Sequence, residues 1–99
     1  MAIQHTVVFT LRHAAGSAEE RDFLETGRRE LTSIPGVQDF VVHRQVSPKS
    51  DAAWQFSMVF ADQDAYDAYN VHPAHVAFVE GRWVPEVASF QEYDFTPFD

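Results

Sequence analysis

The chain is predicted to adopt an α+β, ferredoxin-like fold with the element order β-α-β-β-α-β in one domain, residues 1–99. Three observations predict it. Strand patterns occur at residues 3–11, 37–46, 54–60 and 87–95, a continuous helical pattern lies between the first two strands, and a proline-interrupted one lies between the last two. This order predicts one four-stranded antiparallel sheet with the helices on one face.

The first strand is predicted from strict alternation over residues 3–11. One face is apolar except for His5, and it comprises Ile3, His5, Val7, Phe9 and Leu11. The opposite face mixes Val8 with polar residues. A face of that character can be covered by a second copy of the same sheet.

The first helix is predicted to begin after Ser17, because Ser17-Ala18-Glu19-Glu20 has the form of a capping box. Apolar residues then follow at helical spacing, namely Phe23, Leu24, Gly27, Leu31 and Ile34. Pro35-Gly36 ends the pattern.

Residues 37–46 and 54–60 are predicted to form a hairpin. The strand over residues 37–46 is less clearly one-sided, because Phe40, Val41 and Val42 are consecutive. Such a run is expected where both faces of a strand are partly buried. The other strand has one strongly apolar face, made of Trp54, Phe56, Met58 and Phe60.

The second helix is predicted to begin after Asp62 and to carry Tyr69 near its end. It should break at His72, because a proline disfavours helical dihedrals at the residue before it, and restart with Pro73 in a first turn. Helical spacing continues to about Trp83, where Pro85 is expected to block it, and residues 87–95 form the last strand.

Composition narrows the class of partner. The net charge is −8, and residues 51–99 hold nine acidic residues against a single basic one, Arg82. Such an acidic half disfavours nucleic acid and anionic membrane surfaces as partners. The absence of cysteine, of a leader-like start and of a long apolar run predicts a soluble cytoplasmic protein without disulfides.

The face of the sheet away from the helices is expected to be apolar enough to need a partner. Its expected members are Val8, Phe40, Val42 and Phe90. We therefore predict a two-fold homodimer in which the sheets pack face to face into a closed α+β barrel.

Three side chains are candidates for chemistry: His5, Tyr69 and His75. His75 has the properties of a general base near neutral pH, and Tyr69 those of a hydroxyl that stabilises an enolate. The aromatic face of Trp54, Phe56 and Met58 suits an apolar ligand. The alternative is that His5 is a hydrogen-bonded core histidine, that Tyr69 only packs and that His75 only bonds a carbonyl.

Other kinds of site are less well supported by the sequence. His72 and His75 have the i, i+3 spacing of metal ligands, but Pro73 makes His72 a helix cap, so no metal site is predicted. No serine lies in a nucleophile elbow and no glycine-rich phosphate loop is present, so no cofactor is predicted.

The chain resembles the stress-responsive dimeric α/β-barrel (Dabb) domain family over almost its whole length. The matching residues are the strand 3–9 with its early histidine, Ile34-Pro35-Gly36-Val37, and His72-Pro73-Ala74-His75-Val76. The resemblance implies a dimeric barrel with a pocket between sheet and helices. One enzyme of the family cyclises a linear polyketide without a cofactor; its catalytic tyrosine and histidine fall on Tyr69 and His75, and a pocket histidine falls on His5. Another of its pocket histidines falls near Trp54.

Three functional hypotheses follow. The first is a pocket for a small apolar, phenolic or carbonyl ligand, with cofactor-free proton transfer by His75, Tyr69 and His5 and ligand contacts from Trp54, Phe56, Met58, Val76 and Val79. The second is a non-catalytic, stress-related assembly module in which these residues complete the core. The third is a cofactor-free oxygenase, by analogy of architecture alone.

Overall fold

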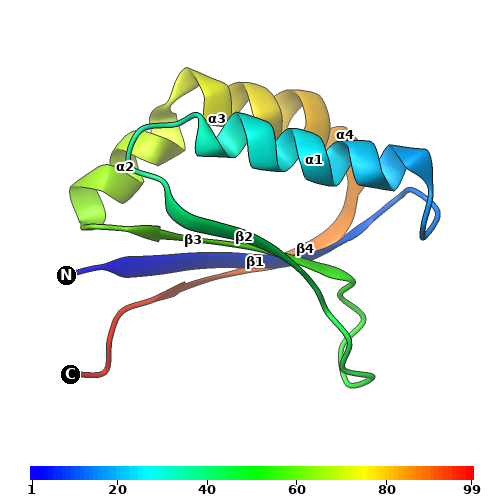
Figure 1. Cartoon of the computed structure of the whole chain (residues 1–99), viewed down its shortest axis with the longest axis horizontal. Coiled ribbons are helices and arrows are strands. Elements are labelled where there is room, and N and C mark those ends of the chain that lie inside the picture. Colours follow the sequence, from blue (N-terminus) through cyan, green and yellow to red (C-terminus); the bar gives the residue numbers. More distant parts are fainter.

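The computed structural model describes all 99 residues and confirms the predicted α+β class (Figure 1). The antiparallel sheet has the order β2-β3-β1-β4, and the helices cover one of its faces. The elements, in chain order, are β1 Ile3–Leu11, α1 Ala18–Thr32, β2 Gln38–Arg44, β3 Trp54–Phe60, α2 Gln63–Val71, α3 Pro73–Phe78, the π-helical turn η1 Val79–Trp83, α4 Val84–Glu86 and β4 Val87–Phe95.

β1 lies in the interior of the sheet, and its register fixes which side chains share a face. His5 pairs with Met58 on β3 and with Asp94 on β4, so all three belong to the helix-covered face. The same face carries Ile3, Val7, Phe9, Phe56 and Phe60, all of them buried. The alternation read from β1 and β3 is therefore confirmed.

The composition of the open face differs from the expectation. Val8 lies there, but the register places Phe40, Val42 and Phe90 on the helix-covered side, and the Phe40 and Phe56 rings pack with centroids 5.4 Å apart. A bulge at Asp39, whose φ is +52°, interrupts the pairing of β2 with β3. The three consecutive apolar residues of β2 also do not show, from sequence alone, which of them point to which face of the sheet.

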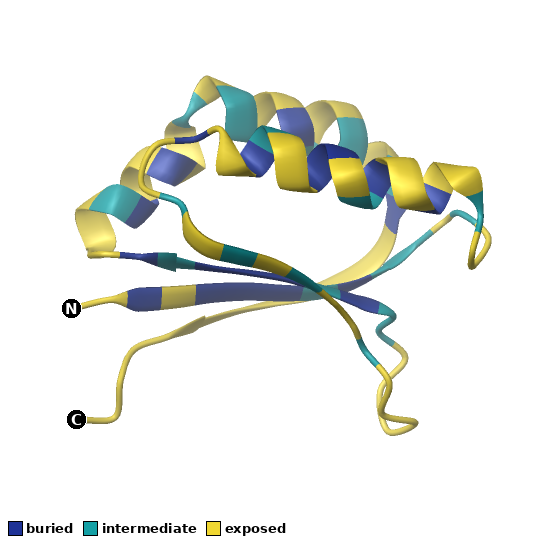
Figure 2. Ribbon diagram, in the orientation of Figure 1, coloured by how far each residue is buried: buried dark blue, intermediate teal, exposed yellow.

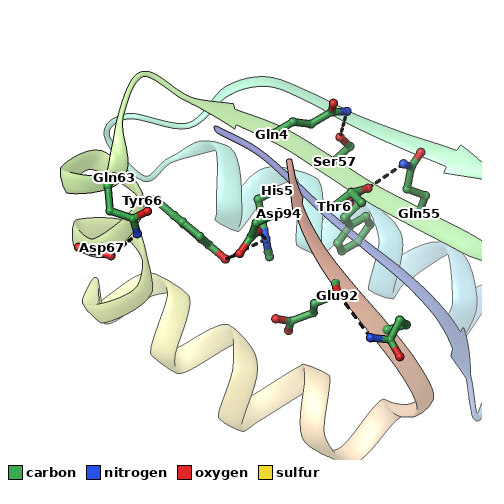
Figure 3. A network of polar contacts seen from close by, with 12 residues as sticks. Gln4, His5, Thr6, Gln55, Ser57, Gln63, Tyr66, Asp67, Glu92 and Asp94 are labelled. Carbon is green, nitrogen blue, oxygen red and sulfur yellow. Dashed lines mark hydrogen bonds and ion pairs between the residues drawn. The ribbon is translucent and has the colours of Figure 1, made fainter. Parts of the chain in front are cut away.

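The open face is mostly polar, with a few apolar side chains. Gln4 donates to Ser57 at 3.1 Å and Gln55 donates to Thr6 at 2.7 Å, so these side chains bond across the β1–β3 pair (Figure 3). The apolar residues on this face are Val8, Val41, Val59, Tyr93 and Phe95. The polar ladder explains how this face stays ordered while it is exposed in a single chain.

The hydrophobic core lies between the sheet and the helices (Figure 2). Phe23 on α1 is its centre, because it is fully buried and contacts rings from four other elements. These rings belong to Phe9, Phe56, Phe78 and Trp83, with centroids 5.6–6.2 Å from that of Phe23. Aromatic packing of this kind connects α1 to both the sheet and η1.

The start of α1 differs in detail from an ordinary capping box. Ser17 Oγ accepts from the Glu20 amide as predicted, but the Glu20 carboxylate accepts from the Gly16 amide and from the Trp54 indole N–H. Glu20 is buried, and both of its oxygens are hydrogen-bonded. This carboxylate therefore joins the helix start to the first residue of β3.

The second helical region breaks and restarts as the sequence predicts. Asp62 caps α2, His72 is extended with ψ 135°, and Pro73 opens α3. Pro85, however, does not stop the helical path at Trp83, because the Val84 amide bonds to the Val79 carbonyl in the π turn and the chain continues to Glu86.

None of the helices of the chain is long and apolar enough to cross a lipid bilayer.

Gly27 on α1 provides a test of this packing. A Cβ atom at position 27 would lie 2.7 Å from Phe56 Cζ, whereas one at Gly81 on η1 would meet nothing within 4 Å. Overpacking lowers the stability of a protein by about 1–3 kcal/mol, whereas the higher helix propensity of alanine than of glycine raises it by about 1 kcal/mol. Gly27→Ala is therefore expected to lower the free energy of unfolding by about 1 kcal/mol in urea titrations. Gly81→Ala is the matched control, and an equal loss there would contradict the packing explanation.

Candidate functional site

A cavity of about 430 Å³ lies between the helix-covered face of the sheet and the α2–α3–η1 segment. Eleven of its fifteen lining residues are hydrophobic, and the other four are His5, Asn70, His75 and Glu92. The volume and the apolar lining with a few polar groups are those of a small-molecule site. His5, Tyr69 and His75 all contribute to the lining, so the structure brings the three predicted residues together around one hollow.

The break at His72 places His75 beside Tyr69. His72 Nδ1 accepts from the Ala74 amide, which holds His72 as a helix cap turned to its own backbone, as predicted. One turn of chain later the His75 ring lies against Tyr69, with centroids 4.4 Å apart. His75 Nδ1 donates to the Asn70 carbonyl at 3.1 Å, so its Nε2 carries the lone pair.

Burial favours the neutral form of His75. Desolvation is the largest influence on its pKa and lowers it below the ordinary 6.5; the nearby His5 also lowers it, while the Asn70 carbonyl and Glu92 act in the opposite direction. A neutral imidazole with a free Nε2 is a proton acceptor.

The Tyr69 hydroxyl is a free donor in an apolar place. The residue is only 2% exposed and its hydroxyl makes no hydrogen bond, yet no fully buried polar side-chain atom of the chain lacks a partner. The hydroxyl therefore reaches the cavity surface. Burial, with smaller contributions from Tyr66 and Glu92, raises the pKa of Tyr69 well above its ordinary value, so the O–H stays protonated.

His5 is held by two residues that the sequence analysis did not select. Its Nδ1 lies 2.6 Å from an Asp94 carboxylate oxygen, and the Tyr66 hydroxyl lies 3.0 Å both from this nitrogen and from the other Asp94 oxygen (Figure 3). Nδ1–H and Tyr66 O–H therefore both donate to Asp94. Both side-chain hydrogen bonds of His5 are at Nδ1, so its Nε2 stays available to a ligand.

The predicted ligand contacts divide into two groups. Phe56, Met58 and Val79 line the cavity. Trp54 and Val76 do not. Trp54 lies in a separate groove beside α1, where Arg44 stacks on its ring at 4.3 Å, and Val76 is 39% exposed outside the lining. The β3 alternation gave the correct face for Trp54 but could not show that this face extends beyond the cavity.

Several residues that line the cavity or hold His5 escaped the sequence analysis. Trp83 was given no ligand contact, and Phe90 was assigned to the wrong face. Tyr66, three residues before Tyr69, shares its helix face and could have been found from that spacing. Glu92 and Asp94 depend on the β1–β4 register, which no local pattern reveals.

Comparison with known proteins agrees with this architecture. The family model described as "Stress responsive A/B Barrel Domain" (Dabb) matches residues 3–97. A crystal structure of a Dabb family protein with a ferredoxin-like fold from Mesorhizobium loti is 55% identical, with a TM-score of 0.98 over 99% of this chain and 98% of that one.

Two further similarities are more distant. Olivetolic acid cyclase of Cannabis sativa is 26% identical over an alignment of 104 positions, which covers 98% of each chain. A dimeric ferredoxin-like protein of unknown function from Thermobifida fusca is 16% identical, with a TM-score of 0.81 over 98% of this chain and 92% of that one, a similarity of fold alone. On the family match over nearly its whole length, the chain belongs to the stress-responsive A/B barrel (Dabb) domain family.

Proposed function

We propose that the protein binds a small apolar compound carrying a phenol or carbonyl group in the cavity and catalyses proton transfer on it without a cofactor. One observation carries the proposal: the unpaired Tyr69 hydroxyl and the neutral His75 lie side by side at the surface of an otherwise apolar cavity. An uncharged acid next to an uncharged base, at the wall of an apolar cavity, is suited to enolisation.

The roles follow from the hydrogen-bond pattern. His75 Nε2 takes a proton from the carbon next to a ligand carbonyl, and the electron pair of that C–H bond moves to the carbonyl oxygen. Tyr69 O–H donates to the enolate oxygen that forms. The enolate carbon then forms a bond with a second carbonyl carbon of the same ligand, and the resulting alkoxide receives the proton from His75. His5 lines the same cavity, and its ring forms a hydrogen bond with a ligand hydroxyl.

The Cannabis sativa relative is named a cyclase, and the proposed bond between the enolate carbon and the second carbonyl carbon likewise closes a ring. At 26% identity the relative supports the reaction class without fixing the substrate. Support from within this chain is the placement of His5, Tyr69 and His75 around one cavity.

We propose in addition that the chain forms a homodimer through the open faces of its sheets. The open face carries five apolar side chains among its polar ladder, namely Val8, Val41, Val59, Tyr93 and Phe95. The Thermobifida fusca protein of the same fold is dimeric. Sedimentation measurements on the wild type and on Val8→Lys test this proposal, and a monomeric wild type would refute it.

Ligand binding is tested by tryptophan fluorescence, because only one of the two tryptophans lines the cavity. Trp83 does so, while Trp54 lies in the separate groove. Titration with 4-hydroxyacetophenone should quench part of the emission, and Trp83→Phe should remove the quenching. Tyr69→Phe and His75→Ala should weaken binding while the protein stays folded by circular dichroism.

The opposite result supports the assembly-module hypothesis. If these variants lower stability and no compound of this class changes the Trp83 emission, the residues only complete the core. Oxygen consumption with a quinol ligand would instead indicate the oxygenase.

A further inference from the structure

The cavity has only one charged residue in its lining, and this residue is acidic. Glu92 projects from β4 toward the space between the sheet and the helices, as Figure 3 shows. Its carboxylate forms neither an ion pair nor a hydrogen bond within the chain, and no lysine or arginine lines the cavity. An unpaired carboxylate at the rim of an apolar cavity disfavours any anion that enters it.

Glu92 lines the same cavity as the two proposed reacting groups, His75 and Tyr69. Its charge acts on both His75 and Tyr69 and raises the pKa of each. Asp94, two residues further along β4, faces the same side through its contact with His5. Two carboxylates, one of them paired with His5, therefore lie on this side of β4, in agreement with the acidic second half of the chain.

The hydrogen-bonding groups of the cavity include strong acceptors but no cationic donor. His75 Nε2 and the Glu92 carboxylate accept, whereas the donors that the lining residues Tyr69, Asn70 and Trp83 carry are all uncharged. A carboxylate or phosphate ligand offers only acceptors and a negative charge. A hydroxylated ring offers O–H donors and requires few hydrogen-bond donors from the protein.

We propose that Glu92 makes the site selective for uncharged compounds that carry an enol or phenol O–H and an apolar substituent, by accepting that O–H and repelling carboxylates and phosphoesters. This inference rests on the proposed function of the cavity and narrows its ligand class. It makes Glu92 a specificity-determining residue that does not take part in the proton transfer.

The test compares two ligands that differ in one group, 4-n-pentylphenol and 4-n-pentylbenzoate, by calorimetric titration at pH 8. The wild type should prefer the phenol. In Glu92→Gln, which keeps the shape and one acceptor oxygen, the ratio of the two dissociation constants should fall about tenfold, the size expected when like charges about 6 Å apart interact through a partly aqueous medium. The affinity for the phenol itself should change by less than about threefold.

Glu80→Gln is the matched control, because it removes the same charge from an exposed residue of η1 that does not line the cavity. Its ratio should remain that of the wild type. A third ligand, 4-n-pentylbenzylamine, tests for a cationic preference. If this amine binds the wild type tenfold more tightly than the phenol and loses the advantage in Glu92→Gln, the proposed ligand class is wrong.

The outcomes separate this inference from the function beneath it. If both aromatic ligands bind and quench Trp83 but Glu92→Gln leaves their ratio unchanged, Glu92 selects nothing and only this inference fails. If no ligand of the set binds the wild type, the proposed function fails, and the selectivity fails with it.

Discussion

Phe23→Ala is expected to lower the free energy of unfolding by about 3–5 kcal/mol, the range for removing a fully buried aromatic ring. Phe23 has no exposed surface and packs against rings from β1, β3, α3 and η1. None of these neighbours can fill the space without losing its own contacts. Chemical denaturation followed by far-UV circular dichroism measures the loss.

Three of the four rings around Phe23 also line the cavity: Phe56, Phe78 and Trp83. The substitution should therefore weaken ligand binding even where the protein remains folded, because the cavity wall loses its support from behind. Leu24→Ala is the control, since Leu24 is the next residue of α1 and only partly buried. A loss for Phe23→Ala no larger than that for Leu24→Ala would show that Phe23 is not the centre of the core.

The parts of the fold that follow from local pattern were predictable from the sequence. Alternation in β1 and β3, the Ser17 and Asp62 caps and the Pro73 restart each depend on residues within one element. The cavity residues Tyr69 and His75 belong to this group, because the geometry of His72-Pro73 brings them together.

The parts that depend on pairing between distant segments were not predictable. Phe90 was assigned to the open face because nothing in β4 itself shows its parity; pairing with Phe9 turns it toward the helices. The same pairing brings Asp94 to His5 across 89 positions of sequence. The π turn likewise accommodates Pro85 at the next helix start, where a regular helix would have stopped.

Proton exchange offers the most direct test of the proposed chemistry. The wild type should catalyse deuterium incorporation into the methyl group of 4-hydroxyacetophenone in D₂O, followed by proton NMR. His75→Ala should slow this exchange about 10²–10⁴-fold by removing the base. Tyr69→Phe should slow it about 10²–10³-fold, because the enolate oxygen loses its donor.

His72→Asn is the matched control for this experiment. It removes an imidazole three residues from His75, and asparagine preserves the cap of α3. Its rate should stay within about twofold of the wild type if His72 serves only as the cap of α3 and His75 is the proposed base. Tyr66→Phe should have an intermediate effect, because it loosens the hold of Asp94 on His5 without touching the base.

The pH dependence provides a second, independent check on His75. Because the pKa of His75 is lowered, its neutral, active form persists below pH 6.5. The exchange rate should therefore begin to fall only at more acidic pH than for a free imidazole. The same shift makes the unfolded chain bind more protons than the folded one, so the free energy of unfolding should decrease as the pH falls from 6.5 toward the pKa of His75 in the folded chain. Glu92→Gln should move the acid limb to still lower pH, since Glu92 raises this pKa. An acid limb at or above 6.5 that is unaffected by Glu92→Gln would mean that another group is the base.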